Sequence, residues 1–270
     1  HLHYSTISRF LFFPSIKGKL CVTQHDVCNA QNSKYLYKFR RIYAISHVVK
    51  LDILNVVGLK SEVVLNGINP ERISHVKQRK DDFFRIVQVS RLLHNKKGQH
   101  ILLQAVHKLV QEGYTTLRLD LIGDGESRDY LQLLVKKLGL QEYVSFLGAR
   151  DQSYIFSHLC NYDLFVQPSV YEGFGLTVAE AMAAKVPVLV SRNQGPLEII
   201  GEGLYGYYFK NKDVNDCAKQ IRIFLDRQND ATQIEIAYKR VVNKYNVKVT
   251  AQTYIEKYND FINSGYAPLR

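Results

Sequence analysis

The segment spanning residues 163–190 constrains the fold more than any other part of the chain. Residues 163–167 are an apolar run typical of a buried strand, and a glycine-containing turn follows at residues 172–175. Residues 176–184 have the composition of a helix, and residues 186–190 return as a second strand. A strand, a helix and a second strand in this order form the βαβ unit that parallel sheets require. The sequence therefore predicts an α/β protein with a parallel sheet.

The turn within this segment has the features of a ligand site. Backbone N–H groups at the start of the following helix lack helical partners and suit a phosphate group. Glu172 precedes the turn and Glu180 lies in the first turns of the helix, so both carboxylates can face one ligand, such as the hydroxyl groups of a sugar or ribose. An ordinary interpretation stays open, in which Glu180 only complements the helix dipole and the glycines only form the turn.

The flanking residues resemble the Glu-x7-Glu signature of retaining, nucleotide-sugar-dependent glycosyltransferases of family 4, which have the GT-B fold of two Rossmann-like domains. The matching residues are Glu172, Gly173, Phe174, Gly175, Leu176, Glu180, Ala181, Met182, Ala183, Pro187 and Val188. The resemblance implies that Glu172 holds hydroxyl groups of the donor sugar and that Glu180 holds the ribose. It also implies a donor-binding role for the turn and helix start, residues Gly173, Phe174, Gly175, Leu176 and Thr177.

Two cationic side chains follow an earlier strand. Residues 85–91 predict a strand that ends at Arg91, residues 92–98 a loop, and residues 99–112 a helix. Open α/β sheets bind ligands at the carboxyl ends of their strands, and two cations there can neutralise a diphosphate leaving group. The resemblance assigns this task to Arg91 and to Lys97, the lysine immediately before a glycine. Lys96 is an adjacent competitor, and a solvated lysine-rich turn is the ordinary alternative.

A second glycine pair follows the next predicted strand, residues 117–122. A dinucleotide-binding fingerprint that contained Gly123 and Gly125 would need a third glycine at position 128, which is Arg128. A nicotinamide-dependent dehydrogenase is therefore disfavoured. The resemblance places the backbone of Gly123 close to the nucleotide, and it places the loop 149–153 beside the base without identifying the base.

The first part of the chain predicts further strands, at residues 19–26, 42–46 and 61–65. Ser46 is placed to cap a helix over residues 48–54. The resemblance implies that His25, at the end of the first of these strands, faces the donor sugar across the cleft. A lone histidine beside a polar turn is more often a turn residue, so the role of His25 depends on the resemblance.

The resulting domain prediction is a partial N-terminal, acceptor-side Rossmann-like domain at residues 1–65 and a C-terminal nucleotide-sugar-binding domain at residues 66–248. Residues 249–270 would be a final helix that crosses back to the first domain. The early βα units and the glycine-rich acceptor loop of the resembling family have no counterpart here, so we expect the chain to be N-terminally incomplete. Helices at residues 129–138, 154–160, 197–200 and 214–226 and strands at residues 143–148 and 206–209 complete the prediction.

The net charge of +11 is concentrated in residues 1–80, which carry +9 of it. The densest basic and aromatic stretch, residues 34–43, can contact an anionic membrane surface or nucleic acid. The interpretation that we favour is a helix with Leu36, Phe39 and Tyr43 facing inward, with the membrane second. No run of about 18 apolar residues exists, so no spanning helix is expected. The resemblance implies a cytoplasmic location, with peripheral contact at the inner membrane face left open.

The resemblance implies a hexosyltransferase-type glycosyltransferase that uses a UDP-, GDP- or ADP-sugar. The resemblance implies a saccharide or lipid-linked acceptor, retention of configuration, and a role in capsule or lipopolysaccharide synthesis. The sequence has no Asp-x-Asp triplet, so neither a metal nor another cofactor is expected. Three alternatives stay open: an inactive fragment that binds a nucleoside diphosphate, a sugar-nucleotide epimerase on the same architecture, and a nucleic-acid-binding protein.

Overall fold

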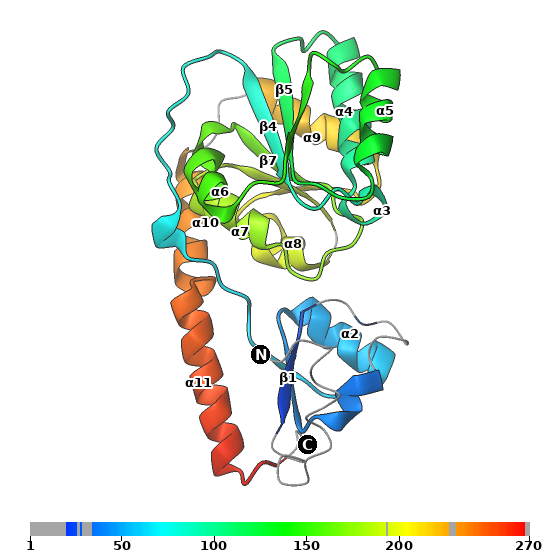
Figure 1. Cartoon of the computed structure of the whole chain (residues 1–270). Helices are drawn as coiled ribbons and strands as arrows, with labels where there is room; N and C mark the ends of the chain where they lie inside the picture. The colour runs from blue at the N-terminus through cyan, green and yellow to red at the C-terminus, as the bar shows by residue number, and fades with distance from the viewer. Residues whose placement is uncertain (1–19, 26–27, 29–33, 193, 227–230, 268–270) are drawn as a thin grey trace. The chain divides into compact units, whose positions relative to one another are not determined.

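The computed structural model describes most of the chain (Figure 1), namely residues 20–25, 28, 34–192, 194–226 and 231–267. The chain divides into two compact units, residues 1–67 with 247–270 and residues 68–246. Within the described ranges, no helix is both long enough and apolar enough to cross a membrane.

The larger unit, residues 68–246, is built on a six-stranded sheet in which every paired strand is parallel. Its strands are β4 (Phe84–Val89), β5 (Leu117–Ile122), β6 (Val144–Gly148), β7 (Leu164–Gln167), β8 (Val188–Ser191) and β9 (Tyr207–Phe209). They lie in the order β6-β5-β4-β7-β8-β9. The predicted α/β fold with a parallel sheet is confirmed.

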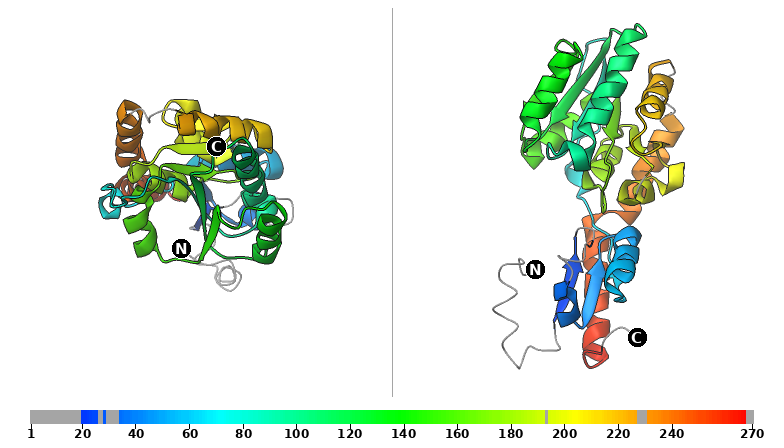
Figure 2. Two further views of the ribbon diagram at one scale, coloured as in Figure 1. Left: turned by 90° about the horizontal axis from the view of Figure 1, so that it is seen from above. Right: turned by 90° about the vertical axis from the view of Figure 1, so that its right-hand side faces the viewer.

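Helices cover both faces of this sheet (Figures 1 and 2). They are α3 (His94–Lys97), α4 (Gln99–Gln111), α5 (Arg128–Lys137), α6 (Gln152–His158), α7 (Leu176–Ala183), α8 (Gln194–Ile199), α9 (Val214–Asp226) and α10 (Ala231–Lys244). The 3-10 turns η2 (Pro70–Arg72), η3 (Leu159–Asn161) and η4 (Gly201–Gly203) complete the unit. Helix α4 packs with α5 and α9, whereas α7 packs with α8 and α10.

The strand order reverses between β4 and β7, which positions the candidate site. From β4 the chain adds β5 and β6 on one side, and from β7 it adds β8 and β9 on the other. Right-handed crossovers then place α4 and α7 on opposite faces of the sheet. Open α/β sheets bind their ligands at such a switch point, which here lies at the carboxyl ends of β4 and β7.

The core of the larger unit lies between the sheet and helices α4, α5 and α9. It includes Ile86 and Leu119 from the central strands, Leu102 from α4, and Ile221 and Phe224 from α9. Burial of such side chains supplies the main driving force for folding. The apolar positions of α4 recur at helical spacing, which is why the sequence predicts this helix.

The smaller unit contains a parallel sheet of three strands in the order β1-β2-β3. The strands are β1 (Cys21–Gln24), β2 (Arg41–Ala44) and β3 (Glu62–Val63), and the helices are η1 (Lys34–Lys38), α2 (His47–Val57) and α11 (Val247–Asn263). The hydroxyl of Ser46 accepts a hydrogen bond from the Val49 N–H at 3.1 Å, so the predicted N-cap is confirmed. Tyr43 of β2 lies edge-on to Tyr254 and Tyr258 of α11.

Three local predictions were wrong. Residues 34–43 do not form one helix, because a short 3-10 turn ends at Lys38 and β2 begins at Arg41. Leu36 and Tyr43 are buried as predicted, but they belong to different elements. The predicted loop 92–98 contains the single helical turn α3. Helix α8 begins at Gln194, three residues before the predicted start of this helix at residue 197.

Packing in the core predicts that two leucines on neighbouring helices contribute differently to the free energy of unfolding. Leu102 of α4 is 0% exposed, whereas Leu133 of α5 is 66% exposed. Leu102→Ala should lower the free energy of unfolding by about 2–5 kcal/mol, because it leaves a cavity in a packed core. Leu133→Ala is the matched control and should change it by less than about 0.5 kcal/mol. Urea unfolding measures both, and equal effects would contradict the packing described here.

Candidate functional site

The turn before α4 docks directly on the segment that follows β7. Gly98 has φ +71°, and a Cβ atom there would lie 1.9 Å from the carbonyl oxygen of Pro168. The N–H groups of Val170 and Tyr171 both donate to the carbonyl oxygen of Lys96, at 2.9 and 3.2 Å. Only glycine permits so close an approach of two backbones at a positive φ. The docking fixes the positions of the side chains on both loops.

Lys97 and Glu172 form an ion pair across this contact. The Lys97 ammonium donates to Oε2 of Glu172, and the two side chains are only 18% and 16% exposed. Gln167 Nε2 and Ser169 Oγ also donate to that oxygen, each at 3.4 Å. The Lys96 ammonium instead lies 6.0 Å from the centre of the Tyr171 ring. Of the two adjacent lysines, Lys97 is therefore the one that reaches the carboxylate.

Buried glutamines, which the sequence analysis missed, support this arrangement. Gln88 Nε2 donates to the carbonyl oxygen of Lys97 at 3.0 Å and to Ser90 Oγ at 3.3 Å. Gln99 Nε2 donates to the same hydroxyl at 3.0 Å and to the carbonyl oxygen of Arg91 at 2.9 Å. These bonds hold the backbone of both cationic residues. The sequence did contain a signal for these glutamines, namely a polar residue near the end of an apolar strand, as at Gln88 and Gln167.

Arg91 lies beside the glycine loop that follows β5. A Cβ atom on Gly123 would lie 1.9 Å from the Ser90 carbonyl oxygen, and one on Gly125 would lie 3.0 Å from Cγ of Arg91. The side chain of Arg91 is exposed. Its guanidinium makes no hydrogen bond or ion pair with any residue in the described ranges. A cation without a protein counter-ion at the end of a parallel strand can bind an anion.

The start of α7 follows the segment after β7 that packs against Gly98. Gly175 caps the helix with φ +102°, and the first-turn N–H groups of Leu176 and Thr177 have no partner within the helix. The Gly195 N–H donates to the carbonyl oxygen of Glu172 at 3.1 Å, which ties the turn to α8. Leu176 is 41% exposed. These amides can therefore serve an anionic ligand.

Phe174 belongs to the core by its side chain. It is 3% exposed and lies edge-on to Tyr245, with the ring centres 5.7 Å apart. Any contact between Phe174 and the donor would therefore come from its backbone. Its role in donor binding stays a prediction.

Glu180 is buried on α7, and the described residues supply no hydrogen bond or ion pair to its carboxylate. Burial disfavours the charged form and raises its pKa to about 7. A carboxyl that is partly protonated near neutral pH can both donate and accept hydrogen bonds, and the hydroxyl groups of a diol can pair with either form.

His25 belongs to the smaller unit and directly follows β1. Its predicted position opposite the donor sugar stays a prediction. Among the residues that the structure describes, no three histidine, cysteine or acidic side chains are grouped so that they could hold a metal ion.

Comparisons with known proteins give the family. The profile of the family "Glycosyl transferases group 1" matches residues 70–241, which is more than half of the chain. An uncharacterized glycosyltransferase of Methanocaldococcus jannaschii, MJ1607, is 33% identical over 194 residues, 66% of this chain and 49% of the relative. The lipopolysaccharide core biosynthesis glycosyltransferase LpsE of Rhizobium meliloti is 30% identical over 60% of this chain and 46% of its own length.

The fold is also shared with solved structures. Anabaena Alr3699/HepE, solved in complex with UDP-glucose, superposes with a TM-score of 0.79 at 22% identity, over 89% of this chain and 72% of that chain. The predicted GT-B class with Rossmann-like topology is confirmed. The chain belongs to the glycosyl transferases group 1 family. It spans about half the length of the curated relatives that it matches.

The close backbone contact makes Gly98→Ala a sharp test of the site's construction. The added methyl group would collide with the Pro168 carbonyl oxygen, so the free energy of unfolding should fall by about 3 kcal/mol or more. Gly139→Ala is the matched control, because Gly139 has φ +67° and nothing within 4 Å of an added Cβ. The control should show only the backbone strain, about 1–2 kcal/mol. Urea unfolding measures both variants, and equal losses would contradict the contact.

The buried carboxyl makes stability depend on pH in a defined direction. Between the ordinary pKa of 4.5 and the folded value of about 7, the folded state holds a proton that the unfolded state has lost. The free energy of unfolding therefore falls as pH rises through this window. Glu180→Gln lacks this loss, so its stability relative to the wild type should increase by on the order of 2–3 kcal/mol between pH 4.5 and 8.

Urea unfolding at several pH values measures this difference. Glu142→Gln is the control, because Glu142 is exposed. It should follow the wild type across the same pH range. A constant difference between Glu180→Gln and the wild type would show that burial does not perturb the Glu180 carboxyl.

Proposed function

We propose that this chain carries the donor site of a retaining, metal-independent glycosyltransferase that uses a nucleotide diphosphate sugar. The observation that carries the proposal is the backbone contact between the segments that follow β4 and β7. It brings Lys97 to Glu172, next to the N-terminus of α7. Family membership supports the reaction class. The alternative is a protein that binds a nucleoside diphosphate without transferring a sugar.

Stabilisation of the leaving group is the main chemical task in this reaction. When the bond between the anomeric carbon and the diphosphate oxygen breaks, negative charge develops on the diphosphate. Preorganised cations and N–H groups lower the barrier most when they are directed at that charge. In the proposal Lys97, Arg91 and the amides of Leu176 and Thr177 supply them. This assignment needs no metal ion.

The two glutamates take different parts in the proposal. Glu172 would bind hydroxyl groups of the donor sugar while its hydrogen bond with Lys97 keeps it oriented. Glu180 would bind the ribose, and its high pKa supports a role as both donor and acceptor. His25 would act from the smaller unit on the donor sugar, and Gly123 would let the nucleotide approach the backbone. Retention of configuration is supported by the resemblance of the Glu172 to Glu180 segment to retaining enzymes.

The acceptor is a saccharide or a lipid-linked saccharide in the proposal. The role of the relative LpsE in lipopolysaccharide core biosynthesis supports a setting in surface polysaccharide assembly. The complex of HepE with UDP-glucose supports a UDP-sugar as the first donor to test. A peripheral association with the inner face of the membrane would suit a lipid-linked acceptor.

Binding of nucleoside diphosphates tests the donor site directly. The melting temperature of the chain should rise with UDP, GDP or ADP, and only the matching base should give a large shift. Lys97→Ala should weaken that binding by about 10- to 100-fold, because a desolvated cation facing the diphosphate is lost. Lys96→Ala is the matched control and should bind almost as the wild type does. Equal losses in both variants would contradict the assignment of Lys97.

Turnover separates the proposal from its alternative. Release of UDP from UDP-glucose, or of the matching diphosphate from another donor, should require a saccharide acceptor. Diphosphate binding without release from any donor and acceptor pair would favour the inactive binding protein. Release of a rearranged sugar without acceptor would instead indicate an epimerase.

A further inference from the structure

A pocket lies beside the amino end of β4, and none of its lining residues belongs to the candidate donor site. It has a volume of 310 Å³ and is lined by Gln78, Arg79, Asp81, Arg85, Asp120, His158, Asn161 and Tyr162. These residues lie in the segment that leads into β4, at the start of β4, in the middle of β5, and in α6 and the turn between α6 and β7. The volume is at the lower end of the range for small-molecule sites.

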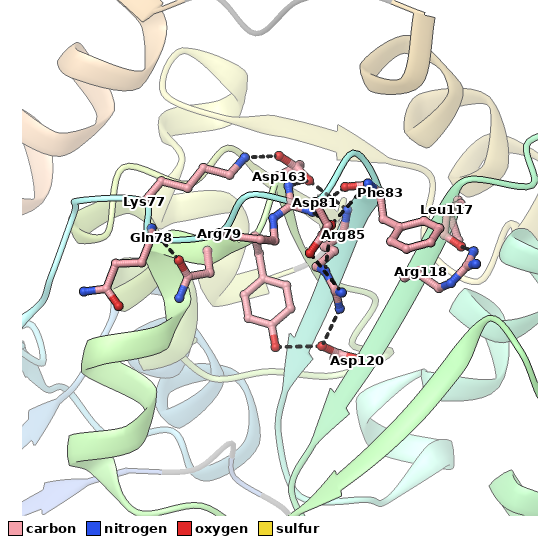
Figure 3. Close-up of polar contacts among 12 residues, drawn as sticks. Lys77, Gln78, Arg79, Asp81, Phe83, Arg85, Leu117, Arg118, Asp120 and Asp163 are labelled. Atoms are coloured by element: carbon pink, nitrogen blue, oxygen red, sulfur yellow. Dashed lines mark hydrogen bonds and ion pairs between the residues drawn. The ribbon is translucent and has the colours of Figure 1, made fainter.

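Asp163 holds one wall of this pocket in place. Its carboxylate accepts from the Lys77 ammonium at 2.6 Å, from the Arg79 guanidinium at 2.7 Å, and from the Arg85 N–H at 2.8 Å (Figure 3). Arg79 also donates to Asp81 at 2.7 Å. The segment before β4 is thereby fixed in position, and charge-assisted hydrogen bonds of this kind are strong and directional.

Arg85 lies between two carboxylates in the same pocket (Figure 3). Its guanidinium is 3.2 Å from Asp81 and 3.9 Å from Asp120. The hydroxyl of Tyr162 donates to Asp120 at 2.9 Å, and burial raises the pKa of the Asp120 carboxyl. Lining side chains are therefore ordered by one another, as a preformed site requires.

Several polar groups in the lining are not engaged by the protein. Asn161 accepts from the Gln78 N–H at 2.8 Å, but the described part of the chain supplies no partner for its Nδ2 group or for the Gln78 side-chain amide. His158 uses Nδ1 within its own helix, at 2.9 Å from the Tyr154 carbonyl oxygen, which leaves Nε2. Donors and acceptors are thus both available to a ligand.

The charge of the lining selects the kind of ligand. Arg79 and Arg85 are balanced by Asp81 and Asp120. An anion would meet the two carboxylates, and a cation would meet the two guanidinium groups. A hydroxyl group both donates and accepts, so a neutral molecule with many hydroxyls can satisfy all of these groups without a charge clash.

We propose that this pocket binds a neutral saccharide. It would be a second carbohydrate site, separate from the candidate donor site at Lys97 and Glu172. This proposal goes beyond the proposed transfer reaction. A glycan held there would be anchored by a surface that takes no part in the chemistry.

Three sugars that share one ring test both the site and the charge argument. Glucose is neutral, glucuronate carries a carboxylate and glucosamine carries an ammonium group. Saturation-transfer NMR on the whole chain, repeated with maltose, measures their binding. The expected result is millimolar binding of glucose or maltose, with glucuronate and glucosamine weaker by about tenfold. Amide shifts of the wild-type chain should map to Gln78, Asn161 and His158.

Variants then assign the binding to this pocket. Gln78→Ala and His158→Ala remove exposed side chains, so folding should be retained, as circular dichroism verifies. Each should weaken saccharide binding by about fivefold or more through the lost hydrogen bonds. Gln104→Ala is the matched control, because Gln104 is exposed on α4 and does not line the pocket, and it should bind the neutral sugars as the wild type does.

Three results would overturn the inference. They are no binding of glucose or maltose when the sugar is in large excess over the protein, preferred binding of a charged sugar, and equal binding in Gln78→Ala, His158→Ala and the wild type. None of these results bears on diphosphate binding at the candidate donor site, so each proposal can be contradicted without the other.

Discussion

The arrangement of the candidate site depends on one contact between backbones, in which Gly98 lies against the carbonyl group of Pro168. Two N–H groups donated to the Lys96 carbonyl oxygen complete it. Because the two segments follow neighbouring central strands, this contact joins the two halves of the sheet at its switch point. The Lys97 and Glu172 side chains meet as a result, and the buried Gln88 side chain holds the Lys97 backbone by donating to its carbonyl oxygen.

Much of the fold could be predicted because its local signals agree. Apolar strands, helix periodicity and turn glycines indicated the same elements, and β5 and α9 have the predicted bounds. Helix α10 was left unassigned, although Ala237 and Val241 face the core at helical spacing. The stretch at residues 34–43 was misjudged because apolar residues three or four apart suit one helix. Burial of Leu36 and Tyr43 was right, but a turn and a strand provide it.

The site was predicted less completely, for physical reasons. Sequence placed Arg91, Lys97 and Glu172 at strand ends, but adjacent lysines cannot be separated by spacing. Only the backbone geometry directs Lys97 inward and leaves Lys96 near Tyr171. The burial of Glu180, and hence its raised pKa, depends on packing between α7 and its neighbours, which no local pattern specifies.

The strand order places the candidate site away from the edges of the sheet. The site residues follow the two middle strands, β4 and β7, whereas β6 and β9 lie at the margins. The register between β5 and β6 already shifts near Gly148, and the central strands remain regular. Insertions or deletions at these margins can therefore be accommodated during evolution, while the residues that follow β4 and β7 keep their positions.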